Sequence, residues 1–352
     1  MKYTRVILIN IYITVGLFLM MAFIFYLISI KRMNDFFQLT TPDHIAYLQK
    51  DSLAMFVHKP SIYIYDNWGT PQQKISTERR TNNLGFREDE DIIEKKINEI
   101  RVLVTGDSHT DGVLKHNYQS FINIWEEKQN EIDTTHTYNF INGGTAYYTF
   151  RNYLGFLKKY KYLKPDVYLI NIFTGNDFRE APIFEDDRAK ISNVFKNFYV
   201  RTRKLFYSKK KKSIPFAQGL EQILYFKSFA NEKEKSLEIA KKYLLEIKEI
   251  CEEENIKLII TLLPSKIETN SEFRNKLQSL FDLDSETIMV NEELTNKLTI
   301  WLNTEKIINL NLTDKLKNAS EKVFWDVDLH INPYAHKIIG DYLLENEKII
   351  LH

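Results

Sequence analysis

The stretch that decides the fold is Arg101–Thr110, which reads RVLVTGDSHT. Its first half, Arg101–Thr105, is rich in β-branched residues and is bounded by Gly106, so it is predicted to be a buried strand. Ser108 then stands at a strand-to-helix junction, where its hydroxyl can be exposed and nearby backbone N–H groups can stabilise negative charge. A serine that merely caps a helix fits the same pattern.

Apolar runs of this kind recur and alternate with helical patterns. This alternation implies an α/β fold with a parallel sheet of about five strands, covered on both faces. In such sheets the functional loops lie at the carboxyl ends of the strands. The further predicted strands are Tyr138–Ile141, Asp166–Phe173, Lys257–Leu263 and Ile307–Leu312, and the predicted helices are Tyr118–Gln129, Arg151–Lys161, Glu232–Glu254 and Pro333–Leu344.

The composition excludes some functions. With 48 Lys+Arg and 47 Asp+Glu in 352 residues, the formal net charge of +1 argues against a protein that mainly coats nucleic acid. The one cysteine, Cys251, excludes an internal disulfide and a cysteine-cluster metal site.

The N-terminus carries an uncharged stretch, Val6–Ile30, after a short tail of residues 1–5. As a helix it would be about 37 Å long, enough to cross roughly 30 Å of hydrocarbon with some tilt. A cleaved signal peptide would have a shorter apolar core and a small-residue cleavage site, whereas this stretch runs straight into Lys31 and Arg32. We therefore expect an uncleaved transmembrane anchor, with a buried core helix as the other reading. Basic residues flank it on both sides, so charge alone does not orient it.

The rest of the chain divides into two parts. Residues 31–95 are mixed and aromatic-rich, and we expect an irregular membrane-proximal segment. Residues 96–352 are expected to form the main domain, with an insertion at about 178–230 that contains the basic run Lys209–Lys212. The insertion can be a lid or can contact anionic lipid or an acidic glycan, but a solvated basic loop is the simpler interpretation.

Polar clusters also follow the second and third predicted strands and precede the last helix. Gly144 lies in the first cluster, and its N–H can stabilise an oxyanion because glycine permits close backbone approach. Asn176 lies in the second, and its side-chain amide can donate to the same charge. His330 lies in the third, and an imidazole oriented by a carboxylate is the usual proton acceptor for a serine nucleophile. Each cluster alone also fits an ordinary turn or loop, but their joint occurrence favours one site.

Together these blocks resemble the SGNH/GDSL hydrolase superfamily over about residues 80 to 350. The resemblance implies a three-layer, flavodoxin-like sandwich around the parallel sheet, here preceded by one N-terminal transmembrane helix. The matching blocks are Gly106-Asp107-Ser108, Gly144, Gly175-Asn176-Asp177 and Asp328 with His330, and Asn83–Arg87 is similar to a segment of a membrane-anchored, exported branch.

By this resemblance Ser108 is the nucleophile, His330 the base and Asp328 the group that orients the imidazole. The N–H groups of Ser108 and Gly144, with Asn176 Nδ2, stabilise the oxyanion, while Asp107 and Asp177 are expected to support the site. Two positions depart from the common pattern. His109 stands where Leu or Phe is commoner, and Val327 stands where many members place the acid, so Asp326 is a second candidate for it.

The resemblance implies a membrane-anchored serine esterase whose domain lies outside the cytoplasm. O-acetyl groups of cell-surface carbohydrate are the expected substrate, and a lipid ester is the runner-up. An O-acyltransferase of the same fold, or a non-catalytic scaffold or carbohydrate-binding component of a membrane assembly, are the alternatives. The chemistry requires no cofactor, and the histidine spacings indicate no metal site.

Overall fold

A five-stranded parallel sheet forms the centre of the computed structural model, which describes residues 2–37, 46–70, 73–185, 191–210, 219–326 and 330–352. The strand order is β6-β5-β7-β8-β9, so β5 lies between β6 and β7 and the predicted parallel sheet is confirmed. The strands are β5 Glu99–Gly106, β6 Thr137–Asn142, β7 Val167–Phe173, β8 Lys257–Leu263 and β9 Ile308–Asn311.

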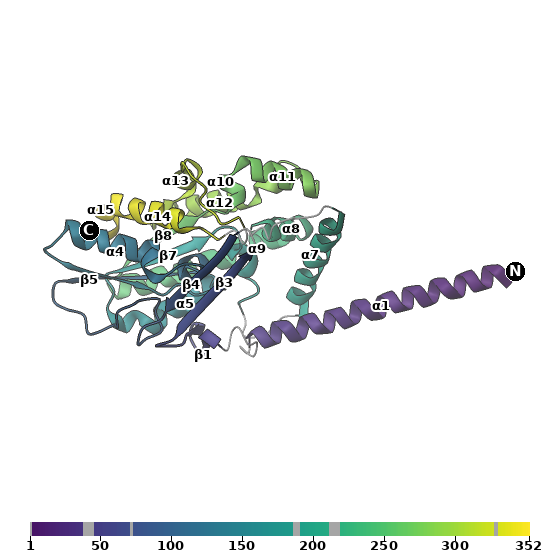
Figure 1. Cartoon of the computed structure of the whole chain (residues 1–352), viewed down its shortest axis with the longest axis horizontal. Helices are drawn as coiled ribbons and strands as arrows, with labels where there is room; N and C mark the ends of the chain where they lie inside the picture. The colour runs from purple at the N-terminus through teal and green to yellow at the C-terminus, as the bar shows by residue number, and fades with distance from the viewer. Residues whose placement is uncertain (1, 38–45, 71–72, 186–190, 211–218, 327–329) are drawn as a thin grey trace.

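Helices cover both faces of the sheet, which gives the expected three layers (Figure 1). Side chains alternate along each strand, so Leu103 and Ile170 join one buried cluster while Val104 and Leu169 join the other. The first cluster packs against α5 (Phe150–Tyr160), α8 (Leu220–Ser228), α9 (Asn231–Glu253) and α12 (Val290–Thr304), and the second against α4 (Phe121–Ile132), α13 (Thr313–Lys317), α14 (Pro333–Glu345) and α15 (Glu347–Leu351).

The other helices are short or lie outside these layers. The helix predicted from residue 118 begins only at Phe121, because Ser120 accepts a hydrogen bond from the Ile122 N–H and caps it. The remaining helices are α3 (Ser108–Asp111), α6 (Asp177–Glu180), α7 (Ile191–Lys210), α10 (Lys266–Thr269) and α11 (Ser271–Phe281), with short 3₁₀ turns at Asn117–Gln119, Lys161–Leu163 and Thr287–Met289.

The segment before the sheet is irregular only in part: residues 81–95 contain no helix or strand, but the prediction is wrong for residues 48–80. It contains two antiparallel hairpins, β1 (Leu48–Asp51) with β2 (Met55–His58) and β3 (Tyr63–Thr70) with β4 (Gln73–Arg80). The second hairpin does alternate, but two of its buried positions are Asp66 and Arg79. Because these inward positions carry charged residues, the sequence lacks the alternation of apolar and polar residues that identifies a half-buried strand.

Most of the described part of the insertion is helical rather than a loop, so the solvated-loop interpretation is wrong there. Arg201, Arg203 and Lys204 lie within α7, while Lys211 and Lys212 lie outside the described residues. Helix α8 is part of the core, where Leu220 and Ile223 are completely buried.

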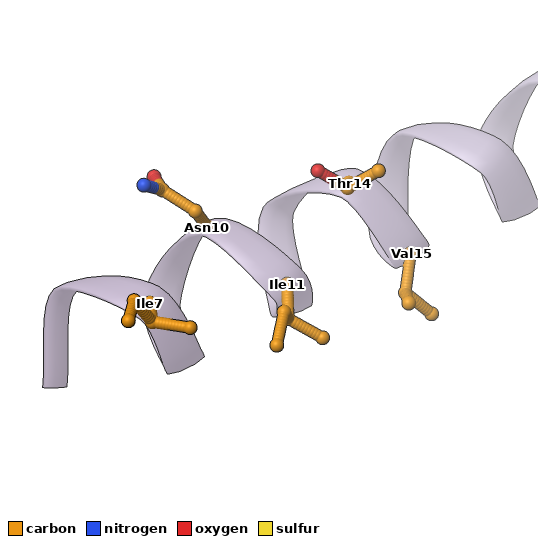
Figure 2. Close-up of a pocket in the computed structure, with 5 residues that line it drawn as sticks. All are labelled: Ile7, Asn10, Ile11, Thr14 and Val15. Carbon is orange, nitrogen blue, oxygen red and sulfur yellow. The ribbon is translucent and has the colours of Figure 1, made fainter. Parts of the chain in front are cut away.

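The N-terminal helix α1 (Lys2–Phe37) extends away from the domain (Figure 1). Its stretch Arg5–Arg32 is long and apolar enough to cross a membrane, and none of the residues in its most apolar window is buried in the protein. Figure 2 shows part of this helix, where the uncharged polar side chains of Asn10 and Thr14 project to one side and the aliphatic side chains of Ile7, Ile11 and Val15 to the other.

The first hairpin is hydrogen-bonded to α5 and to Tyr148 just before it. The Asn152 side chain donates to the Ala54 carbonyl at 3.0 Å, and Tyr148 Oη donates to the Phe56 carbonyl at 2.6 Å. At Gly155 the hairpin backbone approaches so closely that an added Cβ would lie 2.1 Å from the Leu53 carbonyl oxygen. The hairpin therefore packs on the domain as part of it.

We predict that Gly155→Ala destabilises the protein by roughly 1–3 kcal/mol, because the new methyl group would displace the hairpin backbone. Helix propensity alone predicts the opposite, a gain of about 1 kcal/mol. Urea unfolding of the full chain in detergent measures the difference. Gly16→Ala is the control, since no atom lies within 4 Å of its added Cβ, and a stabilised Gly155→Ala variant would show that the hairpin is not packed in this way.

Candidate active site

The candidate nucleophile stands on a one-turn helix at the end of β5. Asp107 caps this helix, α3, by accepting a hydrogen bond from the His109 N–H at 2.9 Å. Ser108 is the first helical residue, and Gly112 ends the helix with a φ of 71°, a left-handed conformation that favours glycine. This strand, cap and single turn hold Ser108 at the carboxyl edge of the sheet.

His330 meets Ser108 at this edge. Its Nε2 atom lies 2.8 Å from Ser108 Oγ, although the two residues are 222 positions apart in the chain. Both side chains are only partly buried, so the pair is accessible from outside. A hydroxyl hydrogen-bonded to an imidazole can lose its proton as its oxygen attacks a carbonyl carbon.

The backbone just after His330 is hydrogen-bonded to the segment that follows Ser108 and α3. Lys115 is completely buried, and its Nζ donates to the carbonyl oxygens of Ile331 at 2.7 Å and Val113 at 2.8 Å. The Ile331 N–H faces His109 Nδ1 at 3.4 Å, and the His109 ring lies 4.1 Å from that of Phe173 and 4.8 Å from that of His330. His109 thus fills the buried position where a large apolar residue is commoner.

Gly144 packs directly under α3. An added Cβ would lie 2.3 Å from the Asp111 backbone nitrogen, so only glycine lets the loop after β6 come this close. Its own N–H donates to Asn142 Oδ1 at 3.0 Å, a bond that the sequence does not indicate.

Asn176 and Asp177 follow β7, next to the same edge. Asp177 Oδ2 accepts hydrogen bonds from Tyr153 Oη at 2.7 Å and from the Phe173 N–H at 3.1 Å, which closes the loop. Asn176 is partly buried, and its side chain hydrogen-bonds to the carboxylate of Glu180.

Comparison with known proteins identifies the family. The model of the family described as GDSL-like lipase/acylhydrolase matches residues 102–343, well over half of the chain. The chain belongs to this family. It is therefore a GDSL-type hydrolase, from a family that acts on ester bonds.

Several solved structures are similar to this GDSL-type hydrolase at low sequence identity. One is a putative lipolytic protein of the G-D-S-L family from Desulfitobacterium hafniense (15% identity, 70% of this chain and 98% of that one, TM-score 0.40). Another is a GDSL-like lipase from Bacteroides thetaiotaomicron (13% identity, 73% and 93%, TM-score 0.38), and a third is an acetyl xylan esterase (12% identity, 70% and 98%, TM-score 0.42). No curated protein matches the chain.

The third member of the hydrolase's expected triad is a carboxylate. Asp328, the first candidate, lies outside the described residues, as does Val327. Asp326, the second candidate, is paired with Lys322 at 2.9 Å and Lys266 at 3.5 Å. Its hydrogen bond with Lys322 is the main cause that lowers its pKa. Asp326 thus already has two cationic partners.

A groove of about 250 Å³ lies at the two lysines that pair with Asp326. Lys266 and Lys322 line it together with Phe324, the residue that bridges to Ile331 beside the histidine. Within the ranges that the structure describes, no three His, Cys, Asp or Glu side chains cluster in a way that could hold a metal ion.

Several residues that shape the site were not singled out from the sequence. Lys115 and Asp111 are completely buried charges, and each contacts a segment distant in the chain. A charged residue in a loop or at the end of a short helix normally predicts a solvated side chain. No sequence signal therefore identifies either residue; only their partners do.

Two buried carboxyl groups, Asp107 and Asp177, lie on the loops that carry the candidate site residues. Burial raises the pKa of Asp107 to about 8, and the negative charges of Glu180 and Asp111 add to this, against the opposing hydrogen bond from the His109 N–H. Burial, with the neighbouring Asp107, also raises the pKa of Asp177 well above its usual range. Folding therefore favours their protonated forms.

We predict that Asp107→Asn makes the protein more stable at alkaline pH. Unfolded, Asp107 loses its proton near pH 4, whereas the folded protein keeps it until about pH 8, so between these values the folded state binds more protons and stability falls as pH rises. The effect is at most roughly 1.4 kcal/mol per pH unit. Asparagine has no such proton and can still cap α3.

Urea unfolding at pH 4.5 and pH 8 measures this difference. The stability advantage of the variant over the wild type should be larger at pH 8 than at pH 4.5, while the exposed Asp314→Asn should behave like the wild type at both. A stability advantage that is the same at both pH values would contradict the assignment.

Proposed function

We propose that this GDSL-type hydrolase is a membrane-anchored serine esterase that forms an acyl-enzyme on Ser108. The observation that carries the proposal is the 2.8 Å distance between Ser108 Oγ and His330 Nε2 at the exposed edge of the sheet. Distances of about 2.6–3.2 Å are those at which a base can take the proton of a nucleophile.

The reaction proceeds in two steps. Ser108 Oγ attacks the ester carbonyl carbon while His330 Nε2 takes the hydroxyl proton, and the same imidazolium then protonates the departing alcohol oxygen. Water attacks the acyl-enzyme next, with His330 as base, and releases the carboxylic acid and free Ser108. We assign Asp328 to orient His330, because Asp326 is engaged with Lys322 and Lys266.

The oxyanion needs donors in fixed positions. Among the described residues, the Ser108 N–H has no acceptor, and it stands at the start of α3 beside the attacking oxygen. We propose this N–H and Asn176 Nδ2 as the main donors; the Asn176 amide has two N–H groups, so it can donate to the oxyanion as well as to Glu180. Gly144 contributes its N–H only when that group leaves Asn142 Oδ1, to which it now donates. Asp107 and Asp177 act as supporting residues that hold the two loops.

The proposed substrate is an O-acetyl group on cell-surface carbohydrate. Support comes from the resemblance of Asn83–Arg87 and of the Asp-x-His pattern at Asp328 and His330 to a membrane-anchored, exported branch of the superfamily. A lipid ester is the second candidate, and a sugar hydroxyl that replaces water in the last step would make the protein an O-acyltransferase. Acetate released from an acetylated polysaccharide, compared with fatty acid released from a phospholipid, distinguishes the two ester classes.

We predict that Ser108→Ala lowers hydrolysis of a small aryl acetate by roughly 10³-fold or more, since no other group replaces the nucleophile. A fluorophosphonate probe should label the native full chain in detergent and leave the variant unlabelled.

Ser271→Ala is the matched control, because Ser271 is an exposed serine at the start of α11. It should hydrolyse and react with the probe like the native protein. Equal rates for native protein and Ser108→Ala would refute the serine mechanism, and a folded native protein that neither hydrolyses nor reacts would favour a scaffold or binding role.

We further propose that α1 stays in the membrane and that the hydrolase domain lies outside the cytoplasm. We predict that α1 resists extraction by alkaline carbonate and that a phosphatase reporter fused after His352, active only outside the cytoplasm, shows activity. A galactosidase fusion at the same position, active only inside, is the control. Activity of the second fusion alone would reverse the orientation, and release by carbonate would contradict the anchor.

A further inference from the structure

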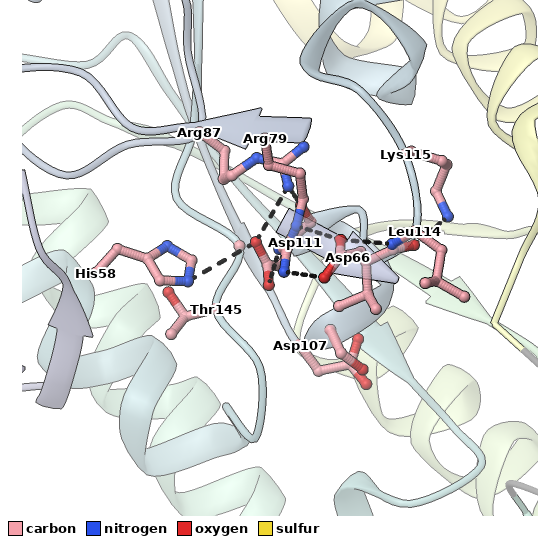
Figure 3. A network of polar contacts seen from close by, with 12 residues as sticks. His58, Asp66, Arg79, Arg87, Asp107, Asp111, Leu114, Lys115 and Thr145 are labelled. Carbon is pink, nitrogen blue, oxygen red and sulfur yellow. Dashed lines mark hydrogen bonds and ion pairs between the residues drawn. The ribbon is translucent and has the colours of Figure 1, made fainter. Parts of the chain in front are cut away.

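A buried cluster of charged side chains lies behind α3, on the opposite end of the helix from the Asp107 cap. Its centre is Asp111, the last residue of α3, which is completely buried. Asp111 Oδ2 pairs with Arg79 Nη1 at 2.7 Å, and Oδ1 lies 3.5 Å from Arg87 Nη1 and 3.8 Å from His58 Nε2. Figure 3 shows these groups converging on the one carboxylate.

A second carboxylate completes the cluster. Asp66 Oδ2 pairs with Arg79 Nε at 2.7 Å and accepts the Leu114 N–H at 3.0 Å, so Asp66 binds the chain just beyond α3. Arg87 donates to the Asp111 carbonyl oxygen and, through Nε, to Asn117 Oδ1 at 3.0 Å. Both ends of the short segment from α3 to Asn117 are therefore held.

The charges of the cluster balance. Two carboxylates, Asp66 and Asp111, face two guanidinium groups, Arg79 and Arg87. Burial lowers the pKa of His58 to about 4, and Arg79 and Arg87 add to this while Asp111 opposes it, so His58 is neutral at pH 7. Because a buried ion that loses its partner is strongly destabilising, each member of the cluster requires the others in place.

The four other charged or titratable members of the cluster come from one part of the chain. His58 lies on β2, Asp66 on β3 and Arg79 on β4, and Arg87 follows in the loop before β5. All four precede residue 102, where the family match begins. The charges that hold the nucleophile helix are thus supplied by the two hairpins and the adjoining loop, outside the family's matched region.

We infer that Asp111 and Arg79 are positioning residues, which act through α3 to hold Ser108 against His330, and that the hairpin segment is part of the catalytic unit. The inference rests on the proposed role of Ser108. A helix of one turn is not stable alone, so its orientation is set by contacts at its ends. A displacement of about 1 Å at a reacting group can cost about 10²-fold in rate.

The test uses the full chain in detergent and two variants. Asp111→Asn removes the central charge at constant shape, and Arg79→Lys keeps the charge but loses the fork that spans two carboxylates. We expect kcat for an aryl acetate to fall at least about tenfold in each, with KM changed less than about threefold, because positioning affects the transition state more than binding. The rate constant of fluorophosphonate labelling should fall in parallel.

A matched control separates positioning from stability. Glu99 and Arg101 form another buried ion pair, at 2.6 Å, at the opposite end of β5 from Ser108. Glu99→Gln should lower the urea midpoint as the cluster variants do but leave kcat and the labelling rate within about twofold of the native values.

The outcomes are distinct. If folded Asp111→Asn and Arg79→Lys keep native kcat and labelling rate, or if Glu99→Gln loses both to the same degree, the inference is overturned. If Asp111→Asn does not fold, Arg79→Lys alone decides, by the same two rates. Failure of the proposed serine mechanism would be recognised separately, because the Ser108→Ala variant would then remain active. That result does not depend on any substitution in the cluster.

Discussion

The hydrogen bond between Ser108 and His330 requires two distant segments to be held at a fixed separation, and much of the surrounding structure serves to hold them. It joins two segments 222 residues apart, each of them short and unable to fix its own position. The parallel sheet brings their elements to one edge, because the carboxyl ends of its strands point the same way. The final distance is then set by local contacts: the Asp107 cap, the close approach of Gly144, and Lys115 on the Ile331 carbonyl.

Buried charges also lie around this pair, since Lys115 and Asp111 are both completely buried. A buried ion pair adds little net stability over well-packed apolar groups, because desolvation offsets most of the attraction. It does demand defined geometry, particularly where an arginine fork spans two carboxylates, as Arg79 does between Asp66 and Asp111. In this hydrolase such geometry connects the hairpins to α3, which carries the proposed nucleophile, so the family's core and the segment before it form one folded body. A shorter chain that began near residue 102 would leave Asp111 without its partners.

Much of the sheet was predictable because apolar periodicity dictates it. The runs at Asp166–Phe173 and Lys257–Leu263 are almost entirely apolar, and both became strands within a residue of the expected bounds. The family motifs predicted Ser108 and His330, and the structure brings these two side chains together. The second hairpin escaped prediction because its inward positions carry Asp66 and Arg79, whose burial depends on partners that no local pattern reveals. The Gly144 N–H bond to Asn142 escaped it for the same reason, since it depends on loop geometry. Asp328 lies outside the described residues, so its role in orienting His330 stays a proposal.

The central claim is that Ser108 carries the acyl group during turnover, and the intermediate itself can be measured. Native full chain is mixed with a small aryl acetate, quenched with acid within milliseconds and digested for mass spectrometry. The account predicts that the peptide containing Ser108 gains the mass of one acetyl group, with the modification on that serine and with an amount that decays as substrate is exhausted. Acetate released at the full rate while the Ser108 peptide stays unmodified, or while the acetyl group accumulates on a different residue, would contradict it.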